Sequence, residues 1–189
     1  MIDFKLYISV MWVVVWLIWL ISAANTKRTL QKESMQNRLL FLVLLGCAAT
    51  LIYVSRQQFT FLNKEIIPDP EIRGWAGMIL TFVSLSFMVW ARLNIGRNWS
   101  GRVIIKEEHE LITSGAYAVT RNPIYTGFLF ALTGYAVAAG TVKGFAFVII
   151  AFTAFLIKIK REEIVLSKHF GNAYDDYRRR VKKIIPMIW

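Results

Sequence analysis

Long runs of apolar residues without charge set the strongest limit on what this chain can fold into. Three runs, Leu6–Ala24, Leu39–Val54 and Gly74–Ala91, contain no Lys, Arg, Asp or Glu. A fourth, Ile124–Ile157, contains only Lys143. Such runs indicate transmembrane helices, because a bilayer core is ~30 Å thick and a helix rises ~1.5 Å per residue. We therefore expect an all-α integral membrane protein.

The fourth run is too long for one membrane crossing, since as a single helix it would measure roughly 51 Å. The segment "AAGTVKGF" in its middle carries Gly140 and Gly144 on either side of Lys143. Glycine favours a turn, so we interpret the run as two short antiparallel helices joined in a tight hairpin. The total is then five transmembrane helices, of which Leu39–Val54 is the shortest and the weakest prediction.

The distribution of basic residues gives an independent test of five spans. With five crossings, residues 25–38, 92–123 and 158–189 share one side of the membrane. These segments hold 4, 5 and 9 Lys or Arg, which is 18 of the 23 in the chain. Basic residues concentrate on the cytoplasmic side of membrane proteins. We therefore expect the N-terminus outside and the C-terminus in the cytoplasm, whereas a four-span arrangement would lose this asymmetry.

The net charge of +11 then reflects a basic cytoplasmic face. Its expected partners are anionic lipids rather than nucleic acid. A soluble all-α protein is disfavoured, because the first run is apolar on every face of a helix. The two histidines lie 60 residues apart and have no cysteine near them, so we expect no metal site. None of the eleven glycines forms a Gly-x-Gly pattern, so we expect no Rossmann domain.

Polar sequence outside the spans collects mainly in the second half of the chain. We divide the protein into residues 1–91, with three transmembrane helices, and residues 92–189, a membrane-embedded region that should carry the functional site. The second part holds the helical hairpin 124–157, a cytosolic loop and the C-terminal helices. The third span should begin at Asp69, a good N-cap, followed by Pro70 in the first helical position.

The C-terminal segment has helical spacing on both sides of an expected break at Gly171. Beyond the break, Tyr174 and Tyr177 are consistent either with an amphipathic helix lying on lipid head groups or with a place in a functional site. The closing "IIPMIW" is typical of an interfacial anchor.

Two polar clusters lie where the predicted hairpin meets the cytoplasm. The first contains Arg121, a planar and always charged fork, beside the unbonded first-turn amides of a helix, which favour anionic groups. The second contains Lys158, Glu162 and Glu163, and carboxylates so close to hydrocarbon are costly unless they are paired or used. Simpler interpretations are an arginine at the head-group belt and a solvated ion pair. Because a hairpin brings its two ends together, we expect Arg121 and Lys158 to face each other across one cytoplasmic mouth.

Three motifs resemble one enzyme family. They are "GRNWSG" (96–101), "HELITSGAYAVTRNPIYTG" (109–127) and "EEIVLSKHFGNAYDDYRRRVKKIIP" (162–186). Together they are similar to motifs of the isoprenylcysteine carboxyl methyltransferases and of the related phospholipid N-methyltransferases. The likeness covers about half of the chain, from Gly96 onward. The Arg-x-Pro-x-Tyr part alone is shared with membrane sterol reductases.

The resemblance implies S-adenosylmethionine as the cofactor, bound on the cytosolic side by the C-terminal half. By motif, the cofactor-binding residues would be His109, Glu110, Leu111, Ile112, Tyr117, Asn122, Pro123, Ile124, Tyr125 and Glu163. The candidate catalytic residues are Arg121, Lys158 and Glu162, the last two facing the methyl acceptor. Two positions depart from the family pattern: Asn122 stands where histidine is usual, and Lys158 stands where the prenylcysteine enzymes have arginine.

The chemistry of the acceptor separates the remaining alternatives. Methyl transfer from a sulfonium mainly requires positioning of donor and acceptor. A carboxylate acceptor of pKa ~3.5 is already ionised and needs no base, whereas a lipid amine needs one, such as Glu162 or Glu163. We favour the carboxylate of an isoprenylcysteine-like acceptor that enters from the bilayer, with phospholipid N-methylation as the alternative. A membrane reductase using NADPH and a non-catalytic lipid-binding protein are weaker alternatives.

Overall fold

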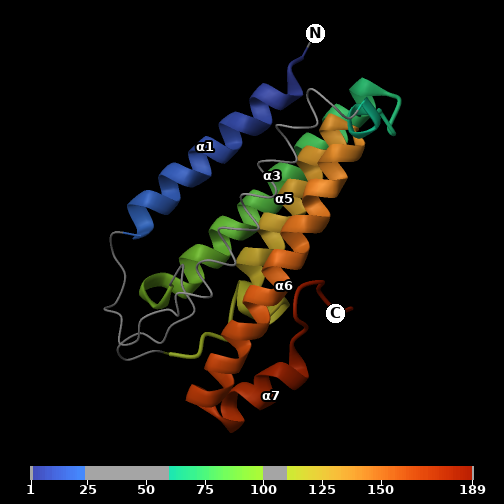
Figure 1. The fold of residues 1–189 in the computed structure, drawn as a ribbon. Helices are drawn as coiled ribbons and strands as arrows, with labels where there is room; N and C mark the ends of the chain where they lie inside the picture. The colour runs from blue at the N-terminus through green and yellow to red at the C-terminus, as the bar shows by residue number, and fades with distance from the viewer. Residues whose placement is uncertain (1, 24–59, 100–109, 189) are drawn as a thin grey trace.

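The computed structural model describes residues 2–23, 60–99 and 110–188, and the regular elements within these ranges are helical (Figure 1). Four long helices form the body: α1 (Phe4–Ala23), α3 (Pro70–Ile95), α5 (Pro123–Ala139) and α6 (Val142–Phe170). The short helices are η1 (Thr60–Asn63), η2 (Gly96–Asn98), α4 (Ala116–Val119) and α7 (Asn172–Arg180). An isolated bridge between Glu65 and Thr141 is the one strand-like pairing in the described ranges.

Three of these helices, α1, α3 and α6, are long and apolar enough to cross a membrane, and α5 is a shorter apolar helix. The expectation of an all-α membrane fold is therefore confirmed at this level. The predicted second span, Leu39–Val54, lies outside the described residues, so the count of five spans remains a prediction.

Helix α3 begins at the predicted cap. The carboxylate of Asp69 accepts hydrogen bonds from the backbone amides of Glu71 (2.9 Å) and Ile72 (3.0 Å), and Pro70 is the first helical residue. The helix extends beyond the predicted run at both ends. Arg73, inside the helix as the cap predicts, and Arg92, which the charge-free run leaves in a loop, both lie in α3 and are buried.

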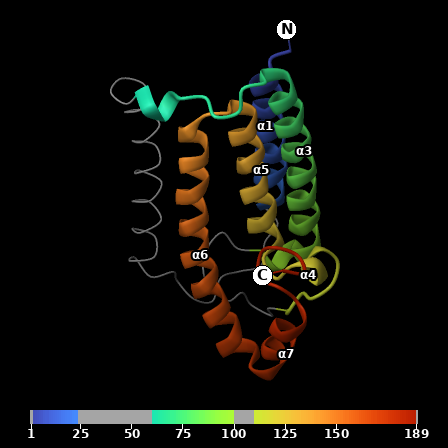
Figure 2. The ribbon, with the colours of Figure 1, turned by 90° about the vertical axis from the view of Figure 1, so that its right-hand side faces the viewer.

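The long apolar run divides at Gly140, where the sequence predicts the hairpin. Gly140 is in the left-handed conformation (φ 64°) and its amide donates to the Ala136 carbonyl oxygen. Helix α6 starts at Val142, so Lys143 and Gly144 belong to its first turn rather than to the connection. Figure 2 shows α5 and α6 running side by side in opposite directions.

The tightest helix contact is between α3 and α5. A Cβ added at Gly77 would lie 2.4 Å from the Gly134 carbonyl oxygen, and one at Gly127 would lie 2.7 Å from that of Ser84. The fully buried Thr81 donates from Oγ1 to the Gly77 carbonyl oxygen at 2.8 Å. Small residues let helix backbones approach closely in membrane proteins. This contact therefore determines where the start of α5 lies.

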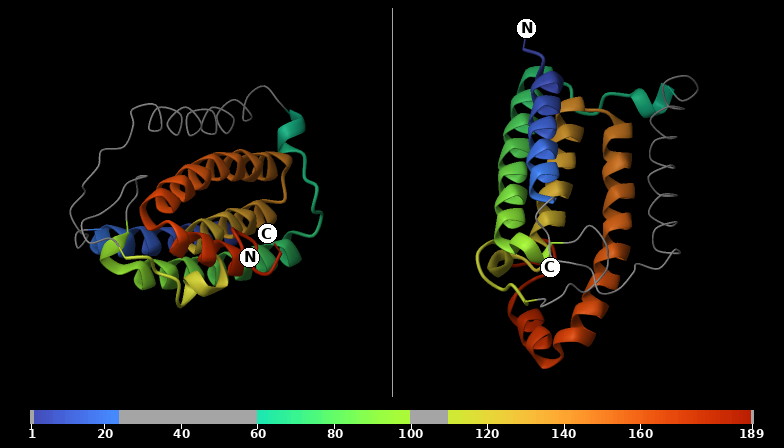
Figure 3. Two further views of the ribbon diagram at one scale, coloured as in Figure 1. Left: turned by 90° about the horizontal axis from the view of Figure 1, so that it is seen from below. Right: turned by 90° about the vertical axis from the view of Figure 1, so that its left-hand side faces the viewer.

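The beginning of α5 and the polar end of α6 lie at the same end of the bundle, together with α4, α7 and the C-terminus (Figures 2 and 3). Helix α1 reaches this end as well. Its Ser22 carbonyl oxygen accepts a hydrogen bond from Arg92 Nη2 (2.7 Å), and its Trp19 packs edge-on against Trp99 with ring centroids 5.7 Å apart.

Candidate functional site

A pocket of about 190 Å³ lies at this end of the bundle, where α1, α3, α5 and α6 converge. Its lining residues are Trp19, Ile95, Trp99, Tyr117, Arg121, Asn122, Pro123, Ile124, Tyr125, Lys158, Glu162 and Leu166. Eight of the thirteen predicted site residues are in this lining. The two polar clusters, Arg121 on one side and Lys158 on the other, therefore share one pocket, as the hairpin argument predicts.

The other predicted residues lie outside the lining. Ile112 packs against the buried cluster that contains Tyr117, Ala116 and Ala91, so it supports the pocket wall from behind. Leu111 is half-buried and Glu110 is exposed. His109 lies outside the described residues.

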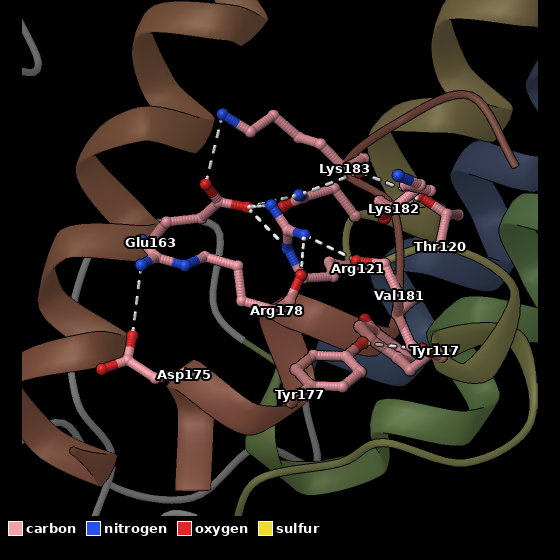
Figure 4. A network of polar contacts seen from close by, with 11 residues as sticks. Tyr117, Thr120, Arg121, Glu163, Asp175, Tyr177, Arg178, Val181, Lys182 and Lys183 are labelled. Carbon is pink, nitrogen blue, oxygen red and sulfur yellow. Dashed lines mark hydrogen bonds and ion pairs between the residues drawn. The ribbon is translucent and has the colours of Figure 1, made fainter. Parts of the chain in front are cut away.

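Glu163 is the centre of a buried ion-pair network (Figure 4). Its Oε1 accepts hydrogen bonds from Arg121 Nε (3.0 Å) and Nη2 (2.9 Å), and its Oε2 lies 3.3 Å from Lys183 Nζ. The side chains of Arg121 and Glu163 are only 8% and 10% exposed. A buried carboxylate needs such partners, because an unpaired charge away from water is strongly unfavourable.

The remaining donors of Arg121 bind the polypeptide that follows α7. Its Nη1 donates to the carbonyl oxygens of Arg178 (3.0 Å) and Val181 (2.6 Å). Every described contact of this guanidinium is thus to another part of the protein. These contacts hold Arg121 and Glu163 in fixed positions, and their predicted roles in catalysis and in cofactor binding remain predictions.

Residues 181–188 form a segment that we call the C-terminal strap. Its carbonyl oxygens accept hydrogen bonds from the residues at the start of α5. These are Thr120 Oγ1 to Lys183 (2.8 Å), the Arg121 amide to Lys182 (2.8 Å), Asn122 Nδ2 to Lys183 (3.1 Å) and Thr126 Oγ1 to Ile184 (2.9 Å). Beyond these bonds Ile184 is buried among Leu129, Phe155 and Ile159. The strap therefore forms the outer support of the pocket's Arg121–Asn122 edge.

The amide of Asn122 has a defined orientation in this network. Its Nδ2 faces the Glu163 carboxylate (3.4 Å) and the Lys183 carbonyl oxygen (3.1 Å). Both of these partners only accept hydrogen bonds when the carboxylate is ionised, so the nitrogen must point toward them. Asn122, which also lines the pocket, therefore has its Oδ1 turned away from these two acceptors.

Glu162 is held on the opposite wall of the pocket. Its Oε1 accepts a hydrogen bond from the Tyr125 hydroxyl at 2.7 Å. Lys158 Nζ lies 5.7 Å from the centre of the same tyrosine ring, within the range of a cation–π contact. Tyr125 thus sets the positions of the carboxylate and the ammonium group, one turn apart on α6.

Tyr117 lines the pocket as a neutral side chain, because burial raises the pKa of its hydroxyl well above the ordinary value. Its carbonyl oxygen accepts a hydrogen bond from the buried Tyr177 hydroxyl at 2.6 Å. Tyr174 is also buried. The interpretation of Tyr174 and Tyr177 as residues lying on lipid head groups is therefore wrong: α7 turns both rings inward, against α4 and the network around Arg121.

Sequence reasoning missed the aromatic wall formed by Trp19 and Trp99. Arg92, which is 2% exposed, lies beside both rings, with its guanidinium carbon 5.8 Å from the Trp19 ring centre and 4.6 Å from that of Trp99. The motif "GRNWSG" is a signal that could have identified Trp99. Nothing in the first span distinguishes Trp19 from Trp12 or Trp16, because its role depends on how α1 packs.

A second, larger cavity has an almost entirely apolar lining. A groove of about 490 Å³ between α1 and α3 is lined by apolar side chains, and Ser86 is the single polar residue in that lining. The smaller pocket, which is lined by the charged residues Arg121, Lys158 and Glu162, is therefore the candidate site.

Comparison with known proteins agrees with the fold and with the motifs. A family model described as phospholipid methyltransferase matches residues 72–173. The chain is 27% identical over 146 residues to a "probable protein-S-isoprenylcysteine O-methyltransferase" of Oryza sativa subsp. indica, covering 72% of this chain and 76% of that protein. It is 30% identical over 132 residues to protein-S-isoprenylcysteine O-methyltransferase A of Arabidopsis thaliana, covering 66% and 67%.

A solved structure has a similar fold. It is that of the eukaryotic intramembrane Ras methyltransferase ICMT, an isoprenylcysteine carboxyl methyltransferase, with a TM-score of 0.58 and 21% identity. The alignment covers 84% of this chain, which spans 55% of the length of the solved one.

Proposed function

Because this chain belongs to the phospholipid methyltransferase family, in the group of isoprenylcysteine carboxyl methyltransferases, we propose that it methylates a lipophilic carboxylate at the membrane surface. The donor is S-adenosylmethionine, and the acceptor is an isoprenylcysteine-like molecule that enters from the bilayer. The observation that carries this proposal is that Asn122, Tyr125, Lys158 and Glu162 line one pocket at the polar end of the bundle. There a water-soluble donor can meet an acceptor held in lipid.

The residues of the pocket suit S-adenosylmethionine. Aromatic faces of Trp19 and Trp99 fit a purine, and the Asn122 Oδ1 fits an ammonium or hydroxyl donor. The pocket is smaller than the roughly 300–1,000 Å³ usual for a drug-sized ligand, so these walls would hold part of it. When bound, the cofactor supplies a methyl group on a sulfonium, and Tyr117, Asn122 and Tyr125 would hold it.

The chain's own residues would orient and neutralise the acceptor. Lys158, a compact ammonium, would bind the acceptor carboxylate as a point charge. Glu162, fixed by Tyr125, would face the same acceptor one turn from Lys158. Arg121 and Glu163 would hold Asn122 and the strap, and so act as positioning residues. No base is required, because a carboxylate of pKa ~3.5 is ionised at neutral pH.

Phospholipid N-methylation is the second candidate, favoured by one observation. The Tyr125 hydroxyl holds the Glu162 carboxylate at the pocket edge, where it could take a proton from a lipid amine. In that case Lys158 would repel the protonated acceptor and the rate should rise with pH.

A pH–rate profile with a farnesylated cysteine acid and with an ethanolamine lipid separates the two candidates. For the carboxylate we expect a rate that is flat above about pH 6. Lys158→Arg should keep turnover, and Lys158→Ala should mainly raise KM. Methylation of the ethanolamine lipid alone, with Glu162→Gln abolishing kcat, would overturn the carboxylate proposal. Calorimetry with S-adenosylhomocysteine and with NADPH tests the cofactor itself.

We also propose that the pocket opens to the cytosol, with the N-terminus outside the cell. Of the 23 Lys and Arg residues, 18 lie in segments assigned to the cytoplasmic side. Reporter tags at the two termini should therefore appear on opposite sides of the membrane. Tags on the same side would contradict the five-span topology.

A further inference from the structure

The C-terminal strap has two sides with different chemistry. On its inner side, backbone carbonyl oxygens bind Thr120, Arg121, Asn122 and Thr126, and Lys183 pairs with Glu163. The side chain of Lys182 is exposed, as is that of Arg180 immediately before the strap. At its far end Met187 and Ile188 are 91% and 74% exposed. The outer side thus combines cations with bare apolar side chains.

The strap lies at the level where lipid head groups would be. Arg121, two residues before the start of the apolar helix α5, contacts Val181. Three residues further along, Ile184 is buried against Leu129 and Phe155 of the apolar helices. The strap therefore passes from the polar end of the bundle toward the hydrocarbon region, with Arg180 and Lys182 at the boundary.

We propose that the strap binds the anionic lipid surface of the bilayer and that this contact stabilises the cofactor pocket. Basic residues beside exposed apolar ones match the chemistry of an anionic membrane interface, where each Lys or Arg is attracted to the negative head groups. The positive charge of α7 alone has another explanation, since cations are favourable at a helix C-terminus. Lys182, Met187 and Ile188 lie beyond that helix, where its dipole does not account for them.

The hydrogen bonds of the strap provide the coupling to the pocket. If lipid holds the strap in place, the Lys183 carbonyl oxygen and ammonium group keep Asn122 and Glu163 oriented. A strap that leaves its place would free both residues and lower the affinity for the cofactor. The lipid would thus raise the affinity for the cofactor only as far as it binds the strap more tightly in its docked position than in a displaced one.

The test measures S-adenosylhomocysteine binding by calorimetry to the chain of residues 1–189 in nanodiscs. The discs contain phosphatidylcholine alone or phosphatidylcholine mixed with phosphatidylglycerol. This readout rests on the proposed use of S-adenosylmethionine. We expect about fivefold tighter binding in the anionic discs, at the low end of usual coupling between sites. The gain should shrink at high salt, because surface charge is screened.

A double variant of the strap, Arg180→Gln with Lys182→Gln, should lose this gain while binding normally in neutral discs. The matched control, Lys160→Gln with Lys168→Gln, removes two exposed charges from α6 instead and should keep it. Soluble glycerol phosphate added to neutral discs should not replace the anionic lipid. Hydrogen exchange of residues 178–188 should slow in anionic discs in the wild type.

Two results would overturn the proposal. One is equal S-adenosylhomocysteine affinity in both kinds of disc, and the other is an equal loss in the strap and control variants, which would indicate general charge attraction. No binding of S-adenosylhomocysteine in any disc would instead count against the proposed function, while slower exchange of the strap in anionic discs would still support the lipid contact.

Discussion

Each end of the bundle contains an arginine–glutamate ion pair. The nitrogen–oxygen distance is the same in both pairs, but the two carboxylates differ in their exposure to water. At the end away from the pocket, Arg73 Nη2 lies 2.9 Å from Glu65, whose side chain is 57% exposed. At the pocket end, Arg121 Nη2 lies 2.9 Å from Glu163, whose side chain is 10% exposed. Lys183 and Asn122 also contact the Glu163 carboxylate, so three side chains are held by this one group.

The difference shows that distance alone says little about the importance of an ion pair. A carboxylate in water loses little when its partner is removed, whereas a buried one leaves uncompensated charge behind. The outer pair joins the segment before α3 to the start of α3, and Gly140 of the hairpin connection packs against its Arg73. The inner pair joins α5, α6 and the strap around the candidate site.

The largest expected effect comes from removing each acidic partner in turn. Glu163→Gln should lower the free energy of unfolding by about 3 kcal/mol, because Arg121 and Lys183 lose their buried counter-charge. Glu65→Gln, the matched control, should lower it less, because Glu65 is exposed to water and Arg73 keeps the Ile67 carbonyl oxygen as a partner. Thermal unfolding in detergent measures both, and equal losses would show that burial does not distinguish the pairs.

The α3–α5 contact that connects the two ends should be the next most sensitive. Gly127→Val places atoms where even a Cβ would lie 2.7 Å from the Ser84 carbonyl oxygen. We expect a loss of about 2 kcal/mol, typical of overpacking, together with weaker ligand binding as the start of α5 moves. Gly144→Ala is the control. Its Cβ would lie 3.2 Å from the Ala136 Cα, so the neighbour needs to move only slightly and the loss of stability should be smaller. A well-folded Gly127→Val protein with normal binding would contradict this packing argument.

Tyr177→Phe tests the support behind Tyr117. The substitution removes the hydroxyl that donates to the Tyr117 carbonyl oxygen at 2.6 Å. We expect a loss of about 1 kcal/mol of unfolding free energy and a higher dissociation constant for S-adenosylhomocysteine. An unchanged dissociation constant would show that this contact of α7 does not contribute to ligand binding in the pocket.

The smallest effect is a difference in how the two ends respond to pH. Burial raises the pKa of Tyr174 and Tyr177, so the folded state holds these protons more tightly than the unfolded state does. Their contribution to stability is full below the ordinary tyrosine pKa of about 10 and is lost as the pH rises beyond it. The thermal midpoint should therefore fall above about pH 10, and less steeply in Tyr177→Phe. Identical slopes in the two proteins would contradict the assignment.

The outer end should respond in the opposite direction. The hydrogen bond and charge of Arg73 lower the pKa of Glu65. Its contribution is therefore present above the ordinary glutamate pKa of about 4.3 and is lost as the pH falls through the lower, folded value. Glu65→Gln should remove this acid-dependent part of the thermal midpoint and leave the alkaline part unchanged.

Much of the fold follows from the sequence because its signals are local. Charge-free runs indicate helices in lipid, Asp69-Pro70 begins α3, and Gly140 and Gly171 end α5 and α6. Even the meeting of Arg121 and Lys158 follows, since a hairpin joins its own ends. The role of Tyr174 and Tyr177 did not follow, because helical spacing predicts a face but not what that face packs against. The division at residue 91 and the second span remain predictions.

By itself the sequence determined the membrane character, the positions of the long helices in the described residues and the two polar clusters of the site, all of which depend on neighbours along the chain. Only the tertiary structure decided which carboxylate is buried, why Arg121 binds the strap, and how Trp19 comes to line the pocket with residues a hundred positions away. Those outcomes depend on the close approach of α3 and α5 and on the return of the chain after α7. Such contacts between distant segments are selected by shape and by the need to satisfy buried polar groups, and the order of residues does not record them directly.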